Sequence, residues 1–66
     1  MTITLNGDPF TLENPLTIGD LLAHLEIDPR GVAVERNFQV VKRDAYGTTA
    51  IEPADHIEIV NFVGGG

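Results

Sequence analysis

One short amphipathic helix pattern, surrounded by strand patterns, limits most strongly what this chain can fold into. Four apolar residues recur at the spacing of one helical stripe: Ile18, Leu21, Leu22 and Leu25. Thr17 offers an N-cap oxygen, and Asp20 follows three residues later, as in a capping box. Gly19 weakens this helix by up to about 1 kcal/mol but permits close packing against a strand. Because a helix of about two turns is unstable alone in water, we expect it to lie across a sheet.

Two strand patterns precede this helix. Residues 2–5 and 10–12 both alternate polar and apolar side chains, which is typical of strands with one buried face. Asn6-Gly7 lies between them and suits the positive φ angles of a type I′ hairpin turn. Asp8-Pro9 is expected to extend the turn, because a residue before proline is pushed out of the helical region. The first 12 residues therefore predict a hairpin.

The chain after the helix is predicted to form strands joined by turns. Strand patterns occur at residues 32–34, 38–41, 48–51 and 56–63. Turns are predicted at residues 28–31, 35–37, 42–47 and 52–55. For residues 42–47 the pattern allows either a turn or a single helical turn. The order strand, strand, helix, strand, short strands, strand indicates an α+β fold of the β-grasp type. We expect a mixed sheet of about four to five strands with one helix packed on one face.

The last strand pattern is expected to divide its side chains between the two faces of that sheet. Ile57 and Ile59 share one face, whereas Glu58, Val60 and Phe62 share the other. If the isoleucines face the helix, Val60 and Phe62 point away from the core and can form a docking patch. The alternative is that Phe62 folds onto neighbouring residues of the outer face. The folded domain is predicted over residues 1–63, with residues 64–66 as a flexible glycine tail.

The charge and composition exclude several functions. Ten acidic residues against four basic ones give a net charge of −6, which argues against nucleic-acid binding and favours basic partner surfaces. There is no cysteine, so the chain has no thiol nucleophile. Apolar runs are too short to span a membrane and no signal peptide is recognisable, so we expect a cytoplasmic protein.

The side chains do not predict an active site. His24 and His56 fall on different predicted elements, and no metal-ligand cluster or nucleophile–base spacing is present. We therefore expect no catalytic residue, no metal ligand and no bound cofactor in this chain. Reactivity is instead expected at the tail, because three glycines can enter a channel too narrow for side chains. A terminal carboxylate is ionised at neutral pH and can attack the α-phosphate of ATP. The alternative is a disordered end without function.

Three segments together carry a family resemblance. They are residues 16–22, residues 32–37 with 41–46, and residues 55–60 leading to Val63-Gly64-Gly65-Gly66. In this order and length the chain resembles the ThiS family, the ubiquitin-like sulfur carriers of thiamine biosynthesis. Lys42 stands where that family often has proline. This difference affects only the shape of the local turn.

The resemblance implies a reaction cycle in which this chain is the substrate. An E1-like adenylating enzyme of the ThiF type would use ATP and Mg²⁺ to adenylate the carboxylate of Gly66. Sulfur from a cysteine desulfurase persulfide would convert it to a thiocarboxylate, which thiazole synthase of the ThiG type would consume. Gly64 and Gly65 would thread partner active sites, and Val60, Phe62 and Val63 would dock on the partners. The free chain is expected to be a monomer.

Three alternatives remain open at this point. The chain could be a sulfur carrier for molybdopterin synthesis, whose members are usually longer. It could be a ubiquitin-like modifier joined to lysines through Gly66. It could also be a β-grasp interaction module whose glycines have no chemical role.

Overall fold

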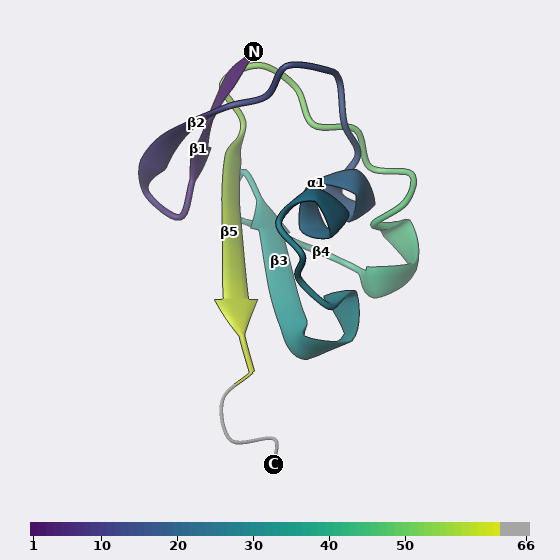
Figure 1. Cartoon of the computed structure of the whole chain (residues 1–66). Coiled ribbons are helices and arrows are strands. Elements are labelled where there is room, and N and C mark those ends of the chain that lie inside the picture. Colours follow the sequence, from purple (N-terminus) through teal and green to yellow (C-terminus); the bar gives the residue numbers. More distant parts are fainter. Residues whose placement is uncertain (63–66) are drawn as a thin grey trace.

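A computed structural model describes residues 1–62, in which one helix lies across a five-stranded mixed sheet (Figure 1). The strands are β1 (Thr2–Leu5), β2 (Asp8–Thr11), β3 (Val32–Arg36), β4 (Gln39–Val41) and β5 (His56–Asn61). Their order in the sheet is β2-β1-β5-β3-β4. β1 and β5 are parallel, and the other neighbours are antiparallel. The predicted β-grasp fold is confirmed, with β5 in the centre of the sheet.

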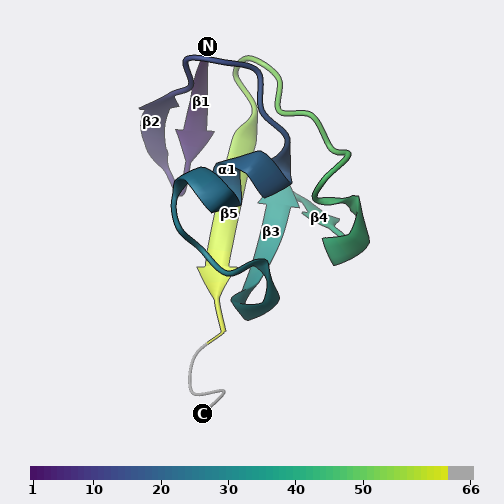
Figure 2. The same cartoon turned by 45° about the vertical axis from the view of Figure 1, so that its right-hand side comes forward.

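The helix α1 (Ile18–His24) begins at the predicted cap. The backbone N–H of Asp20 donates to Thr17 Oγ1 at 3.1 Å, and the Thr17 N–H donates to Asp20 Oδ2 at 3.1 Å. This reciprocal pair satisfies two backbone donors that a helix start otherwise leaves unpaired. Figures 1 and 2 show α1 crossing one face of the sheet. The opposite face of the sheet carries no helix within residues 1–62.

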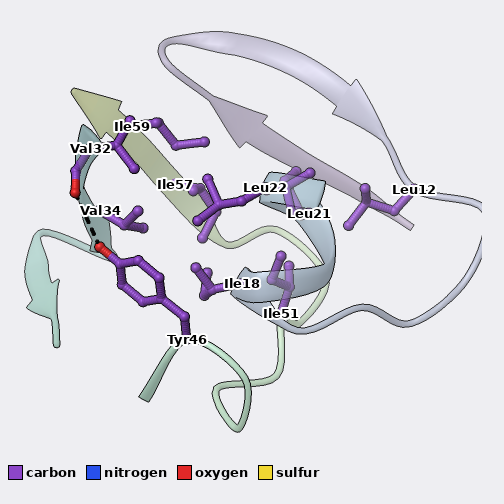
Figure 3. Packing of buried hydrophobic residues seen from close by; sticks show 11 residues of the cluster. Leu12, Ile18, Leu21, Leu22, Val32, Val34, Tyr46, Ile51, Ile57 and Ile59 are labelled. Carbon is purple, nitrogen blue, oxygen red and sulfur yellow. Dashed lines mark hydrogen bonds between the residues drawn. The ribbon is translucent and has the colours of Figure 1, made fainter. Parts of the chain in front are cut away.

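The core lies between α1 and the sheet (Figure 3). Its buried members are Ile3, Leu12, Ile18, Leu21, Leu22, Val32, Val34, Tyr46, Ile51, Ile57 and Ile59. Tyr46 was not predicted in the core, and its hydroxyl donates to the Val32 carbonyl at 3.5 Å. That bond gives the buried phenol a partner, which a tyrosine needs when its ring is removed from water.

Gly19 packs closely, but its neighbour is not a strand as expected. A Cβ at this position would lie 3.3 Å from the Tyr46 carbonyl oxygen, and the Gly19 N–H donates to that oxygen at 2.8 Å. Tyr46 follows the short 3₁₀ helix η2 (Arg43–Ala45), which is the helical alternative predicted for residues 42–47. A second 3₁₀ helix, η1 (Pro29–Gly31), occupies the predicted turn before β3. Gly19 therefore joins α1 to the η2 turn.

The first hairpin is tighter than predicted. Asn6 and Gly7 have φ angles of 49° and 85°, which confirms the two-residue turn. The expected extension by Asp8-Pro9 is wrong, because Asp8 pairs with Leu5 and Pro9 with Thr4 in β2. Proline is compatible with this strand because β2 is at the edge of the sheet and needs no donor there.

Three predictions in the second half also differ from the structure. Glu35 and Arg36 belong to β3, and the turn after them is formed by Asn37 and Phe38, with φ angles of 53° and 69°. The strand expected at residues 48–51 is reduced to one bridge between Thr17 and Ala50. The strand expected at residues 56–63 ends at Asn61 within the described part of the chain.

Candidate functional site

β5 has one buried face and one exposed face. Ile57 is fully buried and Ile59 is buried, so both contribute to the core. Val60 and Phe62 are 57% and 58% exposed on the opposite side. Phe62 is therefore only partly covered by neighbouring residues. These two side chains are available for contact with a partner, and their docking role stays a prediction.

A buried carboxylate fixes the start of β5. Asp55 is 6% exposed and immediately precedes the strand. Its Oδ2 accepts from Arg36 Nε at 2.6 Å and from the Glu52 N–H at 2.8 Å. Its Oδ1 accepts from Asn37 Nδ2 at 3.0 Å. Asp55 thus joins the end of β3, the β3–β4 turn and the beginning of β5.

The pKa of this carboxyl reflects two opposing effects. Burial of Asp55 by itself raises the pKa. The hydrogen bonds from Arg36, from the Glu52 N–H and from Asn37 outweigh burial, so the pKa lies below its ordinary value. Asp55 is therefore ionised at neutral pH, and the Arg36 guanidinium compensates its charge at the start of β5.

Side-chain and backbone bonds hold β5 as far as its last described residue. Asn6, at the tip of the first hairpin, accepts from the Ile59 N–H at 2.7 Å and donates to the Ile59 carbonyl at 3.2 Å. In this way its carboxamide continues the β1–β5 pairing after β1 has ended at Leu5. On the other side, the Phe62 N–H donates to the Gly31 carbonyl at 2.9 Å. The strand is fixed from both sides up to Phe62.

Two exposed apolar residues were missed by the sequence analysis. Phe38 and Val40, in the β3–β4 turn and in β4, are 74% and 73% exposed. The Phe38 ring packs against the His56 ring, with 5.4 Å between ring centroids. The alternation in Phe38-Gln39-Val40 was an available sequence signal, because residues two apart on a strand lie on the same face. In the structure Val41 pairs with the buried Val34, and this leaves Val40 on the outer side.

The other predicted tail residues, Val63, Gly64, Gly65 and Gly66, lie outside the described residues. Within residues 1–62 no three histidine, aspartate or glutamate side chains gather in a way that would hold a metal ion. His24 ends α1 and His56 begins β5, so the two histidines are not brought together as a catalytic pair. None of the helices in the described part of the chain has the length and apolar character needed to span a membrane.

Comparisons with known proteins agree on one family. The model of the ThiS family matches residues 3–66. The sulfur carrier protein ThiS of Bacillus subtilis is 44% identical over 50 residues, which are 76% of each chain. The crystal structure of the thiamine biosynthesis protein ThiS from Geobacter metallireducens has a TM-score of 0.87 at 35% identity, and 100% of each chain is covered.

A second kind of relative is much longer. A thiazole synthase of Magnetococcus marinus is 47% identical over 66 residues, which are 100% of this chain and 20% of that protein. A thiazole synthase of Paramagnetospirillum magneticum is 39% identical over the same proportions. The chain thus spans about a fifth of the length of these two relatives.

Proposed function

Since this chain belongs to the ThiS family, we propose that it is a sulfur carrier for thiamine biosynthesis. The observation that carries the proposal is the likeness over the whole chain to a solved ThiS protein, at a TM-score of 0.87 and 35% identity. The 44% identity to a sulfur carrier of Bacillus subtilis supports the same function. The geometry is compatible with it, because β5 is held in place up to the residues that precede Val63-Gly64-Gly65-Gly66.

In the proposed cycle the carboxylate of Gly66 is the group that changes. A carboxylate oxygen attacks the α-phosphate of ATP, pyrophosphate leaves, and an acyl-adenylate forms. The terminal sulfur of a cysteine desulfurase persulfide then displaces AMP and forms an acyl disulfide. A second thiol attacks the S–S bond of that acyl disulfide, which releases the thiocarboxylate and leaves a disulfide between the two thiol sulfurs. An E1-like adenylating enzyme of the ThiF type supplies the ATP and Mg²⁺ sites. We propose that this cycle takes place in the cytoplasm.

The chain acts in this cycle as a protein substrate and not as an enzyme. Thiazole synthase is the proposed acceptor of the sulfur, which is supported by relatives that contain a matching segment within a thiazole synthase sequence. Gly64 and Gly65 would pass through the narrow entrance of the partner active sites, since glycine has no side chain to obstruct it. Val60, Phe62 and Val63 would contact the partner surface beside that entrance.

A growth experiment tests this function in cells. A strain that lacks its own sulfur carrier is supplied with the wild-type gene, with a Gly66 deletion, or with Glu13→Gln as an exposed control. We expect the wild type and Glu13→Gln to restore growth without thiamine. The Gly66 deletion should fail, because the reacting carboxylate is then displaced by one residue.

The same strains separate the carrier from its alternatives. Growth of the Gly66 deletion strain without thiamine would contradict the proposal. Higher-mass isopeptide conjugates of the chain that disappear with the deletion would indicate a protein modifier instead. Each outcome is read from the full-length protein in the cell.

A further inference from the structure

Two glutamates lie directly opposite each other on the outer face of the sheet. Glu35 of β3 and Glu58 of β5 are register partners, and both are half-buried. Partners on neighbouring antiparallel strands have their Cβ atoms about 5 Å apart, and like charges in such a pair are destabilising. From this register we expect an unfavourable interaction near the middle of the central strands of the free chain.

The cations of the chain do not neutralise this pair. Within residues 1–62 all three ion pairs use Arg30 or Arg36, which bind Asp28, Glu52 and Asp55. Arg43 donates to the Arg30 carbonyl. Lys42, just after β4, makes no ion pair within 4 Å in this part of the chain. Glu35 and Glu58 thus differ from Asp55, whose carboxylate has three hydrogen-bond donors.

Exposed apolar side chains lie around the two carboxylates. Val40 of β4 pairs with Glu35, and Val60 of β5 pairs with Ala33, so both lie next to the glutamates on the outer face. Phe38 lies beyond one end of this group and Phe62 beyond the other. We call these four residues and the two glutamates the outer-face patch. Exposed apolar surface of this kind marks a site that another protein covers. Because charged residues are usually depleted at the centre of an interface, the two glutamates there require a cation from the partner.

We propose that the outer-face patch docks on thiazole synthase, and that the enzyme inserts an arginine or lysine side chain between Glu35 and Glu58. This rests on the proposed function and specifies how the acceptor of the sulfur recognises the carrier. The thiazole synthase is favoured as the occupant because relatives join a chain of this kind to that enzyme. The patch is also continuous with β5, whose end leads to Gly66.

The charge of the patch determines what the enzyme must provide. A cation between the two carboxylates removes their repulsion and forms charge-assisted hydrogen bonds with both. The apolar rim of Val40, Val60 and Phe62 would exclude water around it and so strengthen these bonds. The net charge of −6 would add long-range attraction to a basic surface. A neutral or acidic enzyme surface would leave two half-buried carboxylates unpaired.

The test uses a charge reversal that should improve folding. In Glu58→Lys the new ammonium faces Glu35, so the free chain should have a higher melting temperature than the wild type. Glu13→Lys is the matched control, because it changes the net charge equally at an exposed position between β2 and α1. The Kd of each full chain for the thiazole synthase and for the adenylating enzyme of the same organism is measured by calorimetry at low and high salt.

We expect Glu58→Lys to weaken binding more than about tenfold, since the lysine repels the inserted cation. Glu13→Lys should change the Kd less than about threefold. A Glu58→Lys chain that binds the synthase as tightly as the wild type would overturn the proposal. So would an equal loss in both variants, or a loss confined to the adenylating enzyme. Because the Kd is measured on the unmodified chain, it does not depend on whether Gly66 is converted to a thiocarboxylate.

Discussion

The two faces of β5 differ in what their side chains contact. On the inner face, Ile57 and Ile59 are buried against α1. On the outer face, Val60 and Phe62 are more than half exposed, and Glu58 lies opposite another glutamate. One strand of six residues thus supplies both the centre of the core and a surface that the free chain leaves uncovered. The comparison indicates that stability is determined on one face of the sheet, and the proposed recognition uses the other.

The same division separates two kinds of carboxylate. Asp55 is buried and accepts hydrogen bonds from three partners, so its charge is part of the folded structure. Glu35 and Glu58 are half-buried without an ion pair in the described part of the chain. A carboxylate with internal partners stabilises the domain, whereas one without them is available to another molecule.

The largest expected effect is on the buried face. Ile57→Ala removes a fully buried side chain from the centre of the core, so the free energy of unfolding should fall by about 3 kcal/mol. Val60→Ala on the same strand should change it by less than about 0.5 kcal/mol. Urea denaturation of both variants gives the comparison. Similar losses for Ile57→Ala and Val60→Ala would contradict the division between the two faces.

A smaller effect is expected where the start of β5 is fixed. Asp55→Asn keeps the size of the side chain but removes the charge that Arg36 and Asn37 bind. Because Arg36 retains partial contact with water and a second partner in Glu52, the expected loss is about 2 kcal/mol. Asp28→Asn is a suitable control, since its ion pair with Arg30 is exposed and exposed pairs contribute little.

The pH dependence of stability should identify the same carboxylate. The pKa of Asp55 is lower in the folded chain than in the unfolded one, so the unfolded chain binds more protons in acid. Its contribution is complete above the ordinary aspartate pKa of about 4 and is lost as the pH falls through the lower folded value. In Asp55→Asn the free energy of unfolding, measured by urea denaturation between neutral pH and pH 3, should therefore fall less steeply with decreasing pH than in the wild type. A fall as steep as that of the wild type would contradict this assignment.

The smallest change in stability but a clear change in binding is expected at Phe62. Phe62 is 58% exposed, so Phe62→Ala should alter the free energy of unfolding by less than about 0.5 kcal/mol. Binding to the adenylating enzyme or to thiazole synthase should weaken by more than about 1 kcal/mol, since aromatic residues often dominate interfaces. An unchanged Kd for both enzymes, with the fold intact, would remove Phe62 from the docking surface.

Features that depend on neighbouring residues could be predicted from the sequence. The capping box of Thr17 and Asp20 and the turn at Asn6-Gly7 are local hydrogen-bond and backbone preferences, and both are present. The alternation of β5 placed Ile57 and Ile59 in the core correctly. These elements were sufficient to predict the β-grasp fold, because their order leaves little choice in how the helix covers the sheet.

Features that depend on distant residues could not be predicted. Glu35 and Arg36 read as a polar turn, yet they extend β3 because β5 pairs with them and Asp55 binds Arg36. The actual turn places Phe38 at a positive φ angle, which is uncommon for a residue of this size. Only the sheet register shows that Glu35 faces Glu58. The outer-face patch was therefore predicted in part, through Val60 and Phe62.

The central claim is that the carboxylate of Gly66 accepts sulfur while other proteins supply the catalysis. The most direct measurement is the intact mass of the full chain after incubation with ATP, Mg²⁺, the adenylating enzyme, a cysteine desulfurase and cysteine. We predict that the mass increases by the difference between one sulfur and one oxygen atom, and that the change requires both ATP and Gly66. A mass that stays constant under these conditions, with an adenylating enzyme active on its own carrier, would contradict the account.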